Sequence, residues 1–359
     1  MNKSLTAISS LLLCAGAQGQ TDPGACASLA DSAARLACYD NWALRSGKMP
    51  PAPNPEAPAA VQTADQRAAT QPSEITRFWD LEHASARGAL EIRGYRPISL
   101  AVVGANSVNT QPSSPTNGAA AVATAYGSNE LKINLSVRTK IASGLLRSGN
   151  HPLRDSLWFG YTQQSYWQLF NPALSRPFRA TDHEPELVYV YPHTIALPAG
   201  WTYRLSGIGL VHQSNGQSLP LSRSWNRAYL MAAADKIALS GDRFTLQVRG
   251  WQRIDKRTDD DNPDISNSLG RAELAGTWSF DTGAGSSNEK TTHTLGFTLR
   301  HSLRSTARGS VKLEYLRSLG STNSGLRFHT QLFSGYGDNL IDYNRARTVL
   351  SVGLSLVDW

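Results

Sequence analysis

Short stretches in which apolar and polar residues alternate recur from Pro97 to the C-terminus, and they constrain the fold more than any other feature of this sequence. In residues 131–138, Leu, Ile, Leu and Val alternate with Lys, Asn, Ser and Arg. Because successive side chains of a strand point to opposite faces, this period predicts β-strands with one apolar face. Turn-forming residues separate twelve such runs: Pro97–Val103, Asn129–Ala142, Arg154–Phe170, Glu184–His193, Trp201–Ser214, Arg223–Ala234, Arg243–Ile254, Ser266–Phe280, Thr291–Ser302, Arg308–Leu319, Gly325–Tyr336 and Ala346–Trp359.

An even number of strands of about ten residues, each with a polar second face, is typical of an outer-membrane barrel. A secreted sandwich or lipocalin-like barrel is the alternative, and it would bury its apolar face inward. Twelve long strands exceed what a small soluble barrel can fill, and the terminal Trp359 resembles the assembly signal of outer-membrane barrels. We therefore predict an all-β protein, an antiparallel transmembrane β-barrel of about 12 strands with a small N-terminal periplasmic extension.

The first residues predict export. Lys3, the apolar run Leu11–Cys14 and the small residues 15–17 are typical of a secretory signal, too short to span a membrane. A cysteine at this place can also accept a lipid, but the bulky Leu13 before it disfavours a lipoprotein. We assign residues 1–19 to a signal peptide, 20–48 to a periplasmic extension, 49–75 to a Pro- and Ala-rich linker and 76–359 to the barrel.

Removal of the signal leaves two cysteines, Cys26 and Cys38, in an oxidising compartment, so a disulfide is expected. Twelve residues of straight helix would separate their backbones by about 18 Å, which is beyond disulfide reach. The chain must therefore bend between them, as in a short helical hairpin.

The chain is basic, with a net charge of +7 and a pI near 9.4. In a cytosolic protein this charge would suggest nucleic acid. Export to the outer membrane argues for no nucleic-acid partner and for an anionic lipid surface instead.

Three polar residues lie at the ends of two predicted strands. His212 and Ser214 share a face with Leu210, and Asn226 shares a face with Leu230. A hairpin that is symmetric about residues 215–221 would place Ser214 opposite Ser222, His212 opposite Ser224, and Asn226 diagonal to His212.

The types of these residues suit nucleophilic catalysis. Ser214 can attack an ester once His212 takes its proton, and Asn226 can orient the imidazole. His, Ser and Asn are also ordinary loop residues. Polar groups on a face that meets lipid are costly unless they have a function, which favours the catalytic interpretation.

Four blocks of sequence resemble the outer membrane phospholipase A family over about Phe78 to Trp359. They are His212-Gln-Ser214-Asn-Gly with Ser222-Arg-Ser-Trp-Asn226-Arg; Tyr161-Thr-Gln-Gln-Ser165 with Ser175-Arg-Pro-Phe-Arg; Asp260-Asp-Asn-Pro-Asp264; and Ser334-Gly-Tyr-Gly-Asp-Asn-Leu-Ile-Asp342-Tyr-Asn344. The resemblance implies an outer-membrane enzyme with Ser214 as nucleophile, His212 as proton acceptor and Asn226 orienting His212.

The resemblance also implies a calcium cofactor and activation by homodimerisation. The implied Ca²⁺ ligands are Ser222, the backbone carbonyl of Gln217, Asp261, and Ser175 of the partner subunit. Without the resemblance, Ser222 and Gln217 would be assigned to turn capping and Asp261 to a surface turn. Leu219 departs from the family, whose better-studied members carry an aspartate near calcium at this position.

We therefore predict a calcium-dependent phospholipase A that hydrolyses sn-1 and sn-2 acyl esters of glycerophospholipids, and also lysophospholipids, in the outer membrane. Its expected partners are the phospholipid substrate, outer-membrane lipid and a second copy of the chain. The alternative is a barrel without catalytic activity that serves as a channel or scaffold.

Overall fold

The computed structural model describes residues 23–46, 73–83, 87–254, 260–283, 290–305, 308–320 and 325–356. The chain divides into two compact units, one within Met1–Val61 and the other within Gln62–Trp359. The predicted signal peptide, Cys14, most of the predicted linker and Trp359 lie outside the described residues.

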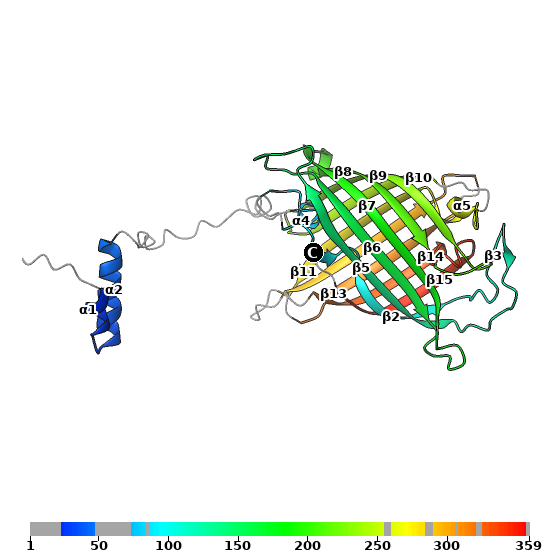
Figure 1. Cartoon of the computed structure of the whole chain (residues 1–359), viewed down its shortest axis with the longest axis horizontal. Coiled ribbons are helices and arrows are strands. Elements are labelled where there is room, and N and C mark those ends of the chain that lie inside the picture. The colour runs from blue at the N-terminus through cyan, green and yellow to red at the C-terminus, as the bar shows by residue number, and fades with distance from the viewer. Residues whose placement is uncertain are drawn as a thin grey trace, which may run out of the picture. The chain divides into compact units, whose positions relative to one another are not determined.

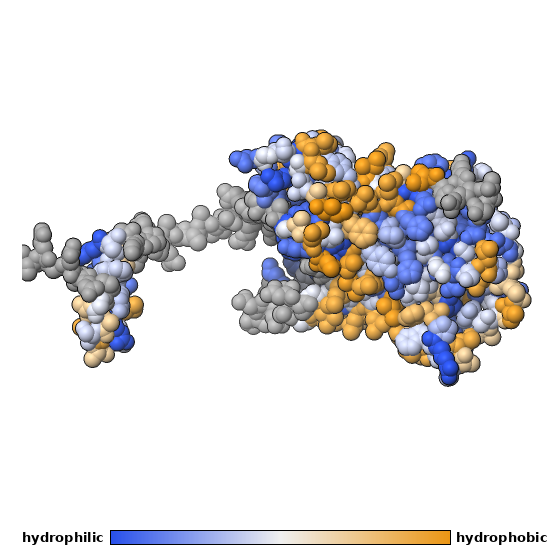
Figure 2. Space-filling model, in the orientation of Figure 1, coloured by the Kyte–Doolittle hydropathy of each residue, from blue (hydrophilic) through white to orange (hydrophobic). Residues whose placement is uncertain are grey.

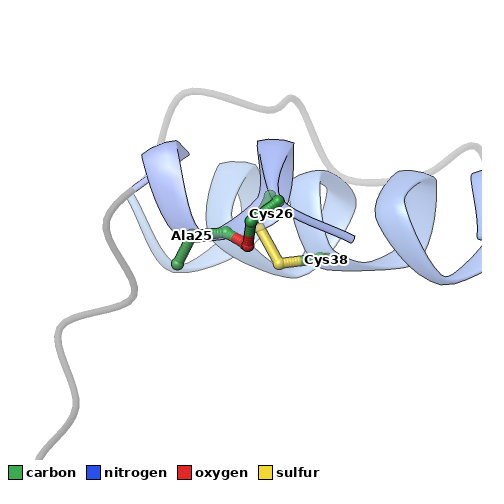
Figure 3. The surroundings of a disulfide bond; sticks show 4 residues. Ala25, Cys26 and Cys38 are labelled. Atoms are coloured by element: carbon green, nitrogen blue, oxygen red, sulfur yellow. A yellow bond between two sulfur atoms is a disulfide. The ribbon is translucent and has the colours of Figure 1, made fainter. Parts of the chain in front are cut away.

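The first unit is a helical hairpin. Helix α1 (Pro23–Ala27) and helix α2 (Ser32–Arg45) are joined by a turn, and Asp31 caps α2 by accepting a hydrogen bond from the Ala34 amide. Cys26 and Cys38 form a disulfide across the two helices, with Cα atoms 5.5 Å apart (Figure 3). The predicted bend and disulfide are confirmed.

The second unit is a closed barrel of twelve long antiparallel strands (Figure 1). These strands are β2 (Ile98–Ala105), β5 (Asn129–Ser143), β6 (Ser156–Trp167), β7 (Phe178–Ala196), β8 (Thr202–Ser214), β9 (Ser224–Ile237), β10 (Arg243–Arg253), β11 (Ala272–Thr282), β12 (Thr291–His301), β13 (Gly309–Ser318), β14 (Leu326–Tyr336) and β15 (Ala346–Leu356). Each pairs with its sequence neighbours, and pairing of β2 with β15 closes the sheet. The predicted fold class is confirmed.

The first strand is interrupted. The short β1 (Ile92–Gly94) pairs with β5 at residues 137–139, and β2 pairs with the same strand at residues 129–134. Pro97 lies in the gap between β1 and β2, where a residue without an amide proton breaks no ladder bond. A small hairpin of β3 (Ser113–Ser114) and β4 (Gly118–Ala119) lies in the connection after β2, and a 3₁₀ turn, η1 (Pro198–Gly200), follows β7.

The outward face of the barrel is apolar and the lumen is polar. Leu210 and Leu230 are 52% and 68% exposed, whereas Glu184 in the lumen is buried and pairs with Arg96 at 2.8 Å and Arg227 at 3.1 Å. Figure 2 shows hydrophobic side chains gathered on the visible outer wall of the barrel. This arrangement is inverted relative to a soluble protein and suits a wall that meets lipid.

Helix α4 (Glu74–Phe78) and the residues after it fill one end of the lumen. Trp79 is buried against Trp158, with ring centroids 5.8 Å apart, and the Arg138 guanidinium lies 3.3 Å from the Phe78 ring centroid. Ser73 caps the helix through the Thr76 amide. Phe78 and Trp79 form part of the lining of a lumenal cavity of about 880 Å³, and most of the other lining residues are polar or charged.

The predicted strand Ser266–Phe280 is wrong in its first residues. Residues Ile265–Leu269 form a short helix, α5, and strand β11 begins only at Ala272. Ile265 and Leu269 are buried against Trp225 and Tyr343, and Gly270 ends the helix with a φ of 99° that favours glycine. Tertiary packing therefore overrides the local alternation.

The connections differ between the two ends of the barrel. The two longest, residues 106–128 and 254–271, lie at the end that also holds the β8–β9 connection, whereas α4 and the end of β15 lie at the opposite end. Long loops are typical of the outer side and short turns of the periplasmic side. Both termini of the barrel therefore lie on the periplasmic side.

The disulfide gives a first prediction. Replacement of Cys26 and Cys38 by serine should lower the free energy of unfolding of the α1–α2 hairpin by about 3 kcal/mol, because the open chain regains the entropy of a short closed loop. We expect trypsin to cut within α2 at lower urea concentration in this variant, while the barrel stays resistant. Equal protection of α2 with and without the disulfide would contradict the prediction.

Candidate active site

The pairing of β8 with β9 sets the geometry of the candidate site. His212 lies directly opposite Asn226, and Ser214 lies opposite Ser224. The register predicted from a symmetric turn is therefore wrong by two residues. The reason is that Asn215 and Arg223 extend the pairing, since the Asn215 amide donates to the Arg223 carbonyl at 3.0 Å.

A side chain fixes this longer pairing. The buried Asn215 side chain accepts a hydrogen bond from the Arg223 amide at 2.9 Å through Oδ1 and donates from Nδ2 to the Leu221 carbonyl at 2.8 Å. The same Oδ1 also accepts from the Gln217 amide at 3.3 Å, two residues on, and this bond imitates a backbone turn. The loop is thereby residues 216–222, which is as long as the predicted loop but displaced by one residue along the chain.

His212 and Asn226 form a hydrogen bond on the outer wall of the barrel. His212 Nδ1 lies 2.8 Å from Asn226 Oδ1. Both residues share their strand faces with exposed leucines, Leu210 on β8 and Leu230 on β9. Ser214 lies two residues beyond His212 on β8 and so on the same face, one pair nearer the outer end.

The segment after β10 holds the start of β9 in place. The fully buried Asn262 side chain accepts a hydrogen bond from the Ser224 amide and donates to the Ser224 carbonyl, both at 2.9 Å. Ser224 is the residue opposite Ser214. Asn262 therefore completes the backbone pairing next to the candidate nucleophile.

Two of the predicted calcium ligands, Ser222 and Asp261, form a hydrogen bond with each other. The Ser222 hydroxyl donates to Asp261 Oδ2 at 2.6 Å, and Asn117 Nδ2 donates to Asp261 Oδ1 at 3.1 Å. Ser222 and Asp261 are both partly exposed at the rim of the barrel. Hydroxyl and carboxylate oxygens are the donor types that Ca²⁺ prefers, so these two residues fit a calcium site.

The other two predicted ligands make other contacts, although Gln217 lies in the same β8–β9 loop as Ser222. Gln217 is exposed in the β8–β9 loop, and its amide donates to Asn215 Oδ1 at 3.3 Å. Ser175 lies in the connection between β6 and β7, at the same end of the barrel, and its carbonyl accepts from the Trp167 indole at 2.5 Å. Among the described residues, no group of three or more His, Cys, Asp or Glu side chains forms a metal site.

Arg223 is a site residue that sequence reasoning missed. It is fully buried, and its Nη1 donates to the carbonyls of Ser222 at 2.6 Å and Pro220 at 2.9 Å. Burial lowers the pKa of the Arg223 guanidinium, which nevertheless stays charged in proteins. This charge organises the carbonyls of the loop that carries Ser222.

The connection between β14 and β15 also contacts Arg223. The Arg223 guanidinium lies 5.9 Å from the ring of Tyr343 in this connection, and the Tyr343 hydroxyl donates to Asp264. Burial, together with this hydrogen bond, raises the pKa of Tyr343, so the hydroxyl keeps its proton and remains a donor. The sequence signal was present in part, because Asn262, Asp264 and Tyr343 all fall in the conspicuous blocks of residues 260–264 and 334–344.

These features define a class of protein, a transmembrane β-barrel with a Ser, a His and an Asn on its outer wall. No helix among the described residues has the length and apolar character needed to cross a membrane.

Comparison with known proteins gives the family. The sequence profile of the phospholipase A1 family matches residues 75–356. A putative phospholipase A1 from Neisseria meningitidis is 31% identical over 98% of this chain and 94% of its own length, and phospholipase A1 from Escherichia coli K12 is 33% identical over 64% of this chain and 70% of its own.

Comparison with solved structures gives the same family. Outer membrane phospholipase A from Escherichia coli superposes with a TM-score of 0.61 at 29% identity, covering 75% of this chain and 99% of that one. An active-site mutant of the same enzyme, with asparagine replaced by alanine, gives 0.60 at 28% identity, covering 76% of this chain and 94% of that one. The Salmonella typhi outer membrane phospholipase dimer with bound calcium gives 0.59 at 28% identity, with the same coverage.

This chain belongs to the phospholipase A1 family of outer-membrane β-barrels. It is a phospholipase of the outer membrane.

The two hydrogen bonds between Asn262 and the Ser224 backbone give a second prediction. Asn262→Ala should lower the free energy of unfolding by about 1–3 kcal/mol, because the Ser224 amide and carbonyl lose their partner in a buried setting. Urea unfolding of the barrel measures this difference. Asn267→Ala is the matched control, since the side-chain oxygen of Asn267 accepts a hydrogen bond from Arg271 Nη2 at 3.0 Å and not from β9. If both variants unfold at the same urea concentration, Asn262 does not hold the strand.

Proposed function

We propose that the chain hydrolyses acyl esters of glycerophospholipids with Ser214 as nucleophile, His212 as base and Asn226 as the group that orients His212. The hydrogen bond between His212 Nδ1 and Asn226 Oδ1, on the lipid-facing wall, is the observation that carries the proposal. The active-site asparagine of the Escherichia coli enzyme supports the role of Asn226.

This hydrogen bond determines the tautomer of His212. The side-chain oxygen of Asn226 carries no proton, so Nδ1 of His212 must donate. In the neutral imidazole the lone pair is then on Nε2, which is the atom free to take a proton from Ser214.

The reaction would proceed in two stages. Ser214 Oγ attacks the ester carbonyl carbon while its proton passes to His212, and the glycerol oxygen leaves with that proton. Water then attacks the acyl group on Ser214, gives a proton to His212, and the fatty acid leaves as Ser214 Oγ is reprotonated. Because Ser214 lies on the outer wall, an ester can reach it from the membrane without removal of the whole lipid from the bilayer.

Calcium binding is part of the proposal. Ser222, Asp261 and the Gln217 carbonyl would hold Ca²⁺, and the ion would supply positive charge near the developing oxyanion. The two ligands of the Ser222–Asp261 pair come from different connections, so calcium would link the β8–β9 loop to the loop after β10.

Homodimerisation completes the proposal. The calcium-bound Salmonella typhi relative is a dimer. Ser175 of the partner subunit would add a ligand to the calcium held by Ser222, so the complete site would form only in the dimer. We further propose that the enzyme acts at both sn-1 and sn-2 positions and on lysophospholipids.

A channel is the second candidate, and the lumenal cavity of about 880 Å³ is the observation in its favour. The aromatic residues around α4 and the ion pairs of the lumen, such as Arg179 with Glu130 at 2.6 Å, occupy much of the path. We therefore favour the enzyme, and conductance in planar bilayers without lipolysis would favour the channel.

The nucleophile can be tested directly. Ser214→Ala should lower phospholipid hydrolysis by at least about a thousandfold in detergent with calcium, because the attacking hydroxyl is lost. Ser218→Ala, which removes an exposed hydroxyl from the same loop, should keep parental activity. A Ser214→Ala variant as active as the parent would rule out this nucleophile.

The calcium site is tested by metal titration. Asp261→Asn should raise the calcium concentration needed for half-maximal activity about tenfold or more, since a charged ligand is lost. It should also reduce the calcium-induced rise in Tm, a measurement independent of activity. Asp242→Asn, in a turn at the opposite end of the barrel, should leave both titrations unchanged. Identical titrations for Asp261→Asn and the parent would place calcium elsewhere.

A further inference from the structure

Three connections at the outer end of the barrel meet at the Asp261 side chain. Asp261 lies in the connection between β10 and β11, and its Oδ2 accepts a hydrogen bond from Ser222 in the β8–β9 connection at 2.6 Å. Its Oδ1 accepts one at 3.1 Å from Nδ2 of Asn117, which belongs to the long connection between β2 and β5. Asn117 is thus a third polar side chain beside two of the proposed calcium ligands.

The small β3–β4 hairpin holds Asn117 at its tip (Figure 1). Ser114 pairs with Gly118, and residues 115–117 form the turn between them. Gly118 has a φ of 67°, a left-handed conformation that favours glycine. The Ser114 hydroxyl accepts a hydrogen bond from the Asn117 amide at 3.2 Å. These contacts fix the backbone from which the Asn117 side chain projects.

Two hydrogen bonds tie this hairpin to neighbouring connections. The Thr116 hydroxyl donates to the Asp260 carbonyl at 2.6 Å, in the connection between β10 and β11. Asn344, in the connection between β14 and β15, donates from Nδ2 to the Ser113 carbonyl at 3.0 Å. The hairpin tip is therefore held beside the calcium-ligand loop by contacts other than that of Asn117 itself.

The Asn117 side chain also has an oxygen to offer. Among the described residues its Oδ1 accepts no hydrogen bond, and the side chain is partly exposed. Rotation of the amide group about its last side-chain bond exchanges Oδ1 with Nδ2 and needs no movement of the backbone. Asparagine carbonyls are among the oxygen ligands that Ca²⁺ takes in proteins, and the ion binds about six to eight oxygens. The ligands proposed above leave positions on the ion that water would otherwise fill.

We propose that Asn117 is a further calcium ligand, which binds the ion through Oδ1 at the site of Ser222 and Asp261. This inference rests on the proposed function. A cation on the Asp261 carboxylate repels the N–H groups of the amide and attracts its carbonyl, so calcium favours the rotated amide. Without calcium the same side chain donates to the carboxylate. Asn117 therefore contacts the site in both states, and the ion joins the β3–β4 hairpin to the β8–β9 loop.

The experiment counts the water molecules on the bound ion. Tb³⁺ replaces Ca²⁺ in protein sites, and comparison of its luminescence decay in H₂O and D₂O gives the number of bound waters. In full-length protein in detergent, Asn117→Leu should carry about one more water on the ion than the parent, because water replaces the lost oxygen. The Tb³⁺ concentration for half-saturation should rise about tenfold.

Three further variants separate ligation from positioning. Asn117→Asp keeps an oxygen in place, so it should match the parental water count and bind Tb³⁺ at least as tightly. Thr116→Val removes the hydrogen bond to Asp260 but no ligand, so its water count should stay parental. Gln111→Leu is the matched control, because Gln111 Nε2 donates to the Ala120 carbonyl within the same connection at 2.8 Å. It should match the parent in both measurements.

A parental water count in Asn117→Leu would overturn the proposal, even if binding were weaker, because Asn117 would then only position Asp261. A parental half-saturation concentration in Asn117→Leu would overturn it as well. Heat-dependent electrophoretic mobility confirms that each barrel is folded. Failure of the proposed calcium site has a different signature, in which Asp261→Asn binds Tb³⁺ as the parent does, and that result would overturn both proposals.

Discussion

A hydrogen-bonded ladder that closes on itself is the constraint on which the rest of this structure depends. Lipid offers no hydrogen-bond partners for backbone amides and carbonyls, so a sheet can span a membrane only if it has no open edge. Pairing of β2 with β15 supplies the closure. The closed sheet has one wall toward lipid and one toward the lumen, and every strand must divide its side chains between them.

The candidate site follows from that division. His212, Ser214 and Asn226 are placed outside the barrel by the period of their strands and brought together by the register of β8 with β9. The register depends in turn on side chains that lie beyond the ladder. Asn215 and Asn262 each satisfy backbone groups at the end of the hairpin and so hold the polar residues in place.

Sequence period predicts the face of a residue well and its partner poorly. A slip of one residue exchanges the two faces of a strand, so it would put Leu210 and Leu230, both expected to face lipid, on opposite walls of the barrel. A slip of two residues leaves every face unchanged, so nothing in the pattern separated Ser222 from Ser224 as the partner of Ser214. The register is decided by hydrogen bonds from the Asn215 side chain to the loop backbone. The period of apolar residues carries no information about such bonds.

The same limit explains the residues that were missed. Arg223 contacts Tyr343 and Asn262 contacts Ser224, in segments far apart in sequence, and helix α5 forms because Ile265 and Leu269 pack against Trp225 and Tyr343. The barrel class, its strands and the bend at the disulfide needed only local pattern and chain geometry. The roles of the triad and the calcium ligands remain proposals, supported by the family and by the contacts described above.

The most direct test of the account is to find which residue an activated-serine reagent modifies. A long-chain alkyl fluorophosphonate is added to the intact protein in detergent with calcium, and the modified peptide is sequenced by mass spectrometry. The account predicts a single adduct on Ser214 that is lost in His212→Ala. An adduct on another serine, or none while the protein hydrolyses phospholipid, would contradict it.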